Sequence, residues 1–158
     1  MSTLALKKLG DIQTLALGYT HEASIDIAKD VPTGGVLNVT AGGSQLAGKI
    51  GKASIVVDEQ VPATSTSGTT YTGYTVIMGD DGDTDGLIAS AELCVGQTPV
   101  AVGTILTNTG DDVYLAPAID NLDITFTSAG EADEALANGG KIRVLLEYYP
   151  TAGDSFSN

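Results

Sequence analysis

Residues 141–148 have the sequence KIRVLLEY, in which apolar and polar side chains nearly alternate. A β-strand places successive side chains on opposite faces, so this alternation predicts a half-buried strand. Its inner face would carry Ile142, Val144, Leu146 and Tyr148. The next residue, Tyr149, would face outward by the same period.

The alternation recurs upstream and predicts a series of strands. In LDITFT at residues 122–127, the side chains of Leu122, Ile124 and Phe126 would point inward. Other strand-like segments are residues 20–27, 35–40, 53–57, 71–78, 99–106 (with Val100, Val102 and Leu106 on one face) and 113–116. Turns rich in Gly, Pro and Asp separate them roughly every eight to twelve residues, a spacing typical of sandwiches and barrels. We therefore expect an all-β fold, a jelly-roll-like β-sandwich or barrel of about eight short strands.

The composition supports an all-β chain with a modest core. Gly accounts for 20 of the 158 residues, and there are six Tyr, two Phe and no Trp. β-Branched and turn residues are plentiful whereas strong helix formers are scarce, which favours strands over helices. A core with so little aromatic volume depends on aliphatic side chains, and burial against other copies of the chain would add to it.

The expected organisation is a single domain between two terminal segments. Residues 1–20 scatter leucines among Lys, Gly and Thr, which predicts an extended N-terminal arm or a loose edge strand; a tail that docks on a neighbouring subunit has such a composition. The β-sandwich domain would cover residues 21–150, and residues 151–158 would form a C-terminal tail. Residues 131–137 could form at most two helical turns before Gly139 and Gly140 end them.

Charge is distributed unevenly along the chain. The formal net charge is −13, and residues 53–140 contain fourteen Asp and Glu but no Lys or Arg. A body this acidic repels nucleic acid and anionic lipid, so neither is an expected partner. No run approaches the roughly 18 apolar residues of a membrane-spanning helix, and residues 1–20 lack the apolar centre of a signal peptide, so we expect no membrane partner.

The few cations lie towards the two ends of the sequence. Lys49 and Lys52 belong to a Gly-rich segment and are predicted to be exposed turn residues. Alternatively, they and the pair Lys7 and Lys8 contact an acidic neighbour, such as the central body of another copy.

One motif matches a metal-binding pattern. Residues 81–92, DGDTDGLIASAE, fit the calcium-loop pattern D-x-D-x-D-G-x5-E. The side chains of Asp81, Asp83 and Asp85 would converge on one ion, and Glu92 would close the cage. Calcium is therefore the one candidate cofactor. The other interpretation, and the one we adopt, is a solvated acidic turn with no cofactor bound, because an EF-hand needs flanking helices and the flanks here resemble strands.

The sequence provides no set of catalytic residues, and we predict that the chain is not an enzyme. His21 is the only His, and its neighbour Glu22 would point to the opposite face of a strand. Cys94 is the only Cys and is predicted to be a packed core thiol. A nucleophile, a base and an orienting group cannot be assembled from one His.

Several short segments resemble a known family. They are VPTGGVL at 31–37, IMGD at 77–80, DGLIASA at 85–91, LDITFT at 122–127 and GGKIRVLLEY at 139–148. Over residues 25–150 this arrangement resembles the small virion structural proteins of tailed bacteriophages, in particular capsid decoration (cement) proteins. The resemblance implies a β-sandwich, made in the host cytoplasm, that sits on the capsid exterior, often as a homotrimer. It also implies that the partner is the major capsid protein, whose neighbouring subunits the decoration protein locks together.

Two other functions stay open. One, which the resemblance also implies, is a structural protein of the tail or collar. The other is a calcium-dependent carbohydrate-binding or host-adhesion module, which would use residues 81–92 and an exposed Tyr. Sugar-binding modules usually present several aromatic side chains on one face, and this chain has few.

Overall fold

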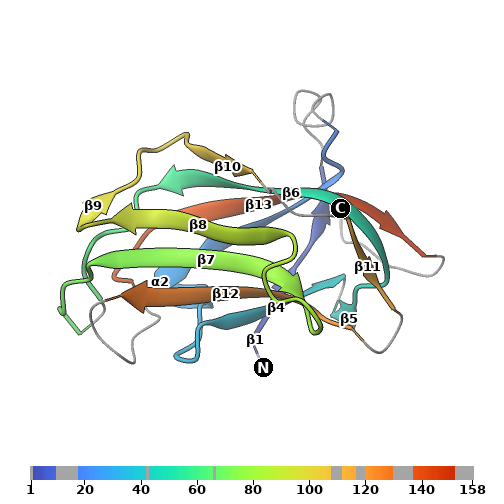
Figure 1. Cartoon of the computed structure of the whole chain (residues 1–158), viewed down its shortest axis with the longest axis horizontal. Helices are drawn as coiled ribbons and strands as arrows, with labels where there is room; N and C mark the ends of the chain where they lie inside the picture. Colours follow the sequence, from blue (N-terminus) through green and yellow to red (C-terminus); the bar gives the residue numbers. More distant parts are fainter. Residues whose placement is uncertain are drawn as a thin grey trace.

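The computed structural model describes residues 2–9, 18–41, 43–65, 67–107, 112–116, 120–129 and 137–151. It is nearly all β, with 62% strand and 3% helix, and its two curled sheets form a sandwich that approaches a half-barrel (Figure 1). The predicted all-β sandwich class is confirmed.

The first sheet, here called sheet A, combines the first strand of the chain with strands between residues 36 and 129. Its strands lie in the order β1-β4-β12-β7-β8-β9, and β5 pairs with β4 off this path. The bounds are β1 Ser2–Ala5, β4 Val36–Ala41, β5 Ser44–Gln45, β7 Gly73–Asp80, β8 Ile88–Val95, β9 Thr98–Pro99 and β12 Leu122–Ala129.

The second sheet, sheet B, packs against sheet A and contains the longest strands. Its order is β10-β6-β13-β3-β2, and β11 pairs with β6. The bounds are β2 Lys7–Lys8, β3 His21–Asp26, β6 Gly48–Glu59, β10 Ile105–Thr107, β11 Val113–Leu115 and β13 Lys141–Pro150. A single turn of helix, α2 (Ile27–Asp30), follows β3.

The core lies between the sheets, on the faces that the alternation predicts. On β13 the buried side chains include Ile142, Val144, Leu146 and Tyr148, and on β12 they are Leu122, Ile124 and Phe126. Tyr149 is 54% exposed, so the outward direction predicted for it is also confirmed.

The outer face of sheet B departs from simple alternation at one place. Leu145 points outward yet is buried, because Leu9 and Tyr19 pack over it and over Val56. Tyr19 also hydrogen-bonds through its hydroxyl to Ser54, and the Lys52 ammonium lies 4.4 Å from the centre of the Tyr19 ring. Leu9 and Tyr19 thus form, together with Val56 and Leu145, a second, small apolar cluster outside the main core.

Residues 2–9 join the chain's own sheets as edge strands. Strand β1 runs parallel to β4 in sheet A, and β2 runs antiparallel to β3 in sheet B. Leu6, between them, is fully buried and donates its N–H to the carbonyl of Thr40 at 2.8 Å. The sequence left two alternatives for this region, an extended arm and a loose edge strand. Residues 2–9 form edge strands. Residues 10–17 of the predicted arm lie outside the described part, as do the predicted tail after Thr151 and the predicted helical turns except Ala137.

Three strand predictions need correction. The described residues form thirteen strands rather than about eight, partly because several contain only two or three residues. Strand β6 extends from Gly48, so Lys49 and Lys52 lie in a strand and not in a turn, since β13 pairs along almost its whole length. The single strand predicted for 99–106 is instead β9, a turn and β10; Gly103, at φ +85°, bends the chain there and leaves Val102 61% exposed.

Candidate interaction surface

His21 and Glu22 do not form an acid–base pair. His21 is buried on the inner face of β3, where its Nδ1 lies 2.7 Å from the Thr20 hydroxyl and its ring packs edge-on against Tyr148. Glu22 points to the outer face, where a carboxylate oxygen lies 3.8 Å from the guanidinium of Arg143. The two side chains therefore serve different faces of the sheet, as the strand period predicts.

Cys94 is a core residue of β8. It is 1% exposed, and burial raises the pKa of its thiol above the usual value. A thiol that is buried and protonated is a poor nucleophile. The burial that we predicted for Cys94 as a packed core thiol is confirmed.

This burial predicts slow chemical labelling of the single thiol. In native buffer, Ellman's reagent should modify Cys94 at least roughly 100-fold more slowly than in urea, because the side chain must first be exposed by unfolding. A matched control is Ser90→Cys, which places a second thiol at an exposed position on the same strand. Equal labelling rates for the two thiols in the folded protein would contradict the prediction.

Residues 81–87 of the calcium-loop pattern form the turn between β7 and β8, and residues 88–92 lie on β8. The turn is held by Asp80, whose Oδ1 accepts the N–H groups of Gly82 at 2.8 Å and Asp83 at 2.7 Å. The Asp81 carboxylate instead faces Asn121, accepting its backbone N–H at 3.2 Å and its side-chain amide at 3.1 Å. Glu92 lies within β8, at the register position opposite Thr75.

These positions give calcium no preformed cage. In the described ranges, no three His, Cys, Asp or Glu side chains are grouped so that they could hold a metal ion. Calcium binding by Asp81, Asp83, Asp85 and Glu92 stays a hypothesis. Titration calorimetry with calcium tests it, and the absence of any heat or shift in melting temperature would remove it.

Charge is divided between the two sheets. Every Lys and Arg of the sequence lies on a strand of sheet B or on α2, and no strand of sheet A carries one. Three of the cations on sheet B form ion pairs with carboxylates: Lys49–Asp112, Lys141–Glu59 at 2.9 Å, and Arg143–Asp58 at 2.7 Å. The partners' carboxylates raise the pKa values of Lys49 and Lys141, which keeps both ammonium groups charged. The strands of sheet A carry only acidic and uncharged side chains.

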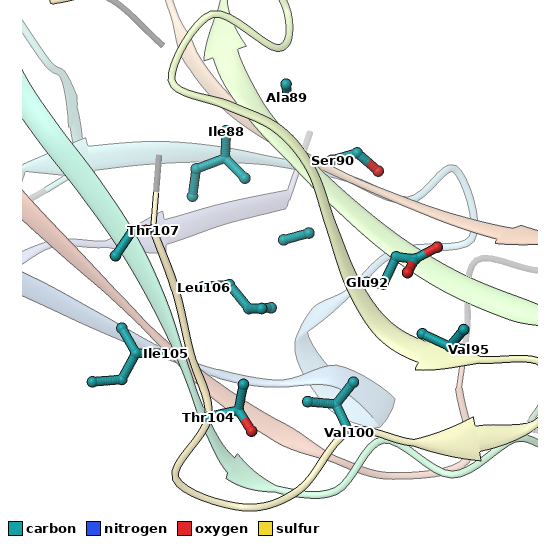
Figure 2. Close-up of a pocket in the computed structure, with 11 residues that line it drawn as sticks. Ile88, Ala89, Ser90, Glu92, Val95, Val100, Thr104, Ile105, Leu106 and Thr107 are labelled. Carbon is teal, nitrogen blue, oxygen red and sulfur yellow. The ribbon is translucent and has the colours of Figure 1, made fainter. Parts of the chain in front are cut away.

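An apolar groove opens where the two sheets end together at β8 and β10. It has a volume of about 700 Å³ and lies between these strands, with the side chains of Ile88 and Leu106 pointing into it (Figure 2). Val95, on its rim, is 48% exposed and Ile105 is 55% exposed. In the part of the chain that the structure describes, residues 88–92 of β8 pair only with β7, and β10 pairs only with β6. Each strand therefore has one edge of backbone N–H and C=O groups without a neighbouring strand.

The groove was not predicted, although a signal for it is present in the sequence. Residues 86–107 contain a single charged side chain, Glu92, in a chain of net charge −13. Edge strands of monomeric proteins are commonly protected by charged residues or Pro, and a charge-poor edge is instead suited to pairing with another chain. Strand β8 was not predicted, because its first five residues belong to the calcium-loop pattern at 81–92.

A second exposed patch lies on the outer face of sheet B. Tyr114 of β11 and Tyr149 of β13 are both register partners of Lys49 on β6, so the three side chains form a row. The tyrosines are 61% and 54% exposed, and the Tyr149 hydroxyl donates to Glu147 at 3.1 Å. This hydrogen bond raises the pKa of Tyr149.

The described residues thus present two surfaces suited to macromolecular contact, the groove and the tyrosine row. The groove combines apolar side chains with two strand edges, a combination that binds an extended chain by adding a strand. No helix among the described residues is both long enough and apolar enough to cross a membrane. Comparison of the chain with family models, with curated proteins and with solved structures found no match.

Proposed function

We propose that this chain is a non-enzymatic structural protein of a bacteriophage virion, which decorates the outside of the capsid and stabilises it by bridging neighbouring major capsid subunits. The observation that carries the proposal is the open flank between β8 and β10. It exposes apolar side chains and two strand edges in a region with one charged residue. Such a flank gains stability when another protein covers it.

The charge distribution supports a place on the exterior. The sequence has 20 Asp and Glu against 7 Lys and Arg, and three of the cations on sheet B, Lys49, Lys141 and Arg143, form ion pairs with carboxylates of the same chain. A body of net charge −13 is repelled by packaged DNA, whereas contact with the outer surface of the shell avoids that repulsion. The partners proposed are the major capsid protein and other copies of the chain as a homotrimer, whose several contacts would add through multivalency. A structural role in the tail or collar would use the same adhesive flank.

The alternative, a carbohydrate-binding or host-adhesion module, draws on the row of Tyr114, Lys49 and Tyr149. Tyrosine side chains offer large amphipathic contact area, which suits an exposed recognition patch. The row contains two aromatic side chains, whereas the groove offers both apolar contacts and backbone pairing.

The test is to add the purified protein to expanded capsids that lack it. We expect saturable binding, visible by negative-stain microscopy, and a higher melting temperature of the capsid. Replacing two groove residues, Val95→Ser with Ile105→Ser, should weaken binding about tenfold or more, because central apolar contacts dominate interfaces. The matched control, Tyr114→Ser with Tyr149→Ser, removes the other exposed apolar pair and should bind like the wild type.

Two results would count against the proposal. Absence of capsid binding by the folded wild-type protein would overturn it. Loss of binding in the tyrosine variant alone, together with retention of a neutral glycan on an array, would favour the adhesion module instead.

A further inference from the structure

Each sheet ends in an exposed strand on both flanks of the molecule. At one flank the terminal strands are β1 in sheet A and β2 in sheet B. At the other flank they are β8, extended at one end by β9, and β10 (Figure 1). A molecule with unpaired strand edges on two opposite flanks can pair with copies of itself in a head-to-tail manner. The lengths are compatible, since β1 has four residues and the uncovered part of β8, residues 88–92, is one residue longer.

The pairing pattern fixes the relative direction of these strands. β1 is parallel to β4, and the steps from β4 to β12, from β12 to β7 and from β7 to β8 are each antiparallel. Three reversals make β8 antiparallel to β1. A second copy that is rotated about an axis parallel to the strands keeps the strand directions, so its β1 would meet β8 as an antiparallel neighbour.

Charge is complementary in this arrangement. The end of β1 leads directly into Lys7 and Lys8, both exposed. The start of β8 is preceded by the acidic turn, in which Asp83 and Asp85 are exposed and form no ion pair with a described residue. An antiparallel β1 brings its lysine end to the acidic end of β8. A parallel β1 would instead bring the lysines to residues 95–100, which carry no charge.

We propose that the open flank binds a second copy of this chain, whose β1 adds antiparallel to β8 and whose Lys7 and Lys8 face Asp83 and Asp85. This inference rests on the proposed function, because it starts from a protein that assembles with others. It then specifies which partner covers the open flank. The contact is heterologous, so successive copies close into a ring when the rotation between them allows it. The charge-poor surface of residues 86–107 is what lets molecules of net charge −13 approach each other at this flank.

Charge reversal with restoration tests the contact. Lys7→Glu with Lys8→Glu, and separately Asp83→Lys with Asp85→Lys, should each raise the dissociation constant of the oligomer at least about tenfold, as measured by sedimentation velocity over a range of protein concentrations. A chain that carries all four substitutions should recover most of the lost affinity, because opposite charges face each other again. The matched control is Lys49→Glu with Lys141→Glu, which makes the same charge change on the central strands β6 and β13 and should associate like the wild type.

The outcomes separate this contact from the proposed function. Recovery in the four-substitution chain supports the contact, since misfolding does not explain it. A change in net charge does not explain the whole pattern either, because Asp83→Lys with Asp85→Lys makes the chain less acidic and should still weaken association. A wild-type protein that stays monomeric at all concentrations, or charge variants that associate normally, would overturn the contact. In either case, a raised melting temperature of decorated capsids would leave the proposed function standing, whereas its absence would remove that function independently.

Discussion

Replacing Gly79 with Ala should destabilise the protein by at least about 3 kcal/mol, the range of severe overpacking. Gly79 lies near the end of β7, where the acidic turn folds back against the strand. A Cβ at this residue would overlap the carbonyl oxygen of Asp83 and lie 2.5 Å from the carbonyl carbon of Thr84 and 2.8 Å from the backbone nitrogen of Asp85. These are backbone atoms, so no side-chain rotation can relieve the overlap. The turn must move away, which breaks the hydrogen bond from Asp80 N–H to Asp83 at 3.0 Å.

The free energy of unfolding from urea titration measures this effect. Gly82→Ala is the matched control, because it is in the same turn, is exposed, and would meet nothing nearer than the Asp80 carboxylate at 3.4 Å. We expect the control to change the free energy of unfolding by less than about 1 kcal/mol. If Gly79→Ala were as stable as Gly82→Ala, the turn would not pack against β7 in this way.

Replacing Tyr148 with Ala should cost about 3–5 kcal/mol of stability, as for other large aromatic residues in cores. Tyr148 is 1% exposed and packs against the His21 ring with centroids 5.3 Å apart. Its hydroxyl donates to the carbonyl of Ala47 at 2.8 Å and accepts the Ala47 N–H at 3.1 Å. The side chain therefore joins β13 to the segment that leads into β6, and its loss leaves both a cavity and an unpaired buried N–H.

Two variants separate these contributions. Tyr148→Phe keeps the ring and removes the hydroxyl, so it should cost about 1–2 kcal/mol, the cost of leaving a buried donor without its partner. Tyr149→Ala removes the neighbouring ring, which is 54% exposed, and should cost less than about 1 kcal/mol. Similar losses for Tyr148→Ala and Tyr149→Ala would show that the strand period is assigned to the wrong face.

The strand faces were predictable because alternation is a local property of the chain. In 122–127 and 141–148 the apolar residues recur at every second position, and the structure buries those side chains. The same reasoning separated His21 from Glu22 and Tyr148 from Tyr149. The burial of Cys94 followed from its apolar neighbours and from the behaviour of free thiols in general.

Predictions failed where the neighbours of a segment decide its structure. Lys49 and Lys52 resemble turn residues because glycines surround them, yet β13 pairs beside them and continues the strand. Alternation alone would leave Leu145 exposed on the outer face, yet it is buried, because Leu9 and Tyr19, far away in the sequence, cover it. The acidic turn matches a calcium pattern, but Asp80 and Asn121, which are not part of that pattern, determine its hydrogen bonds.

The all-β class, the inward and outward faces of the clearest strands, and the gathering of cations towards the ends of the chain can all be derived from the order of residues. The three-dimensional arrangement was needed to show that these cations share sheet B, that residues 2–9 form edge strands on one flank, and that β8 and β10 expose their edges across an apolar groove. The difference arises because the direction of a side chain depends on the backbone within a few residues. The pairing of a strand edge depends on which distant segments fold beside it.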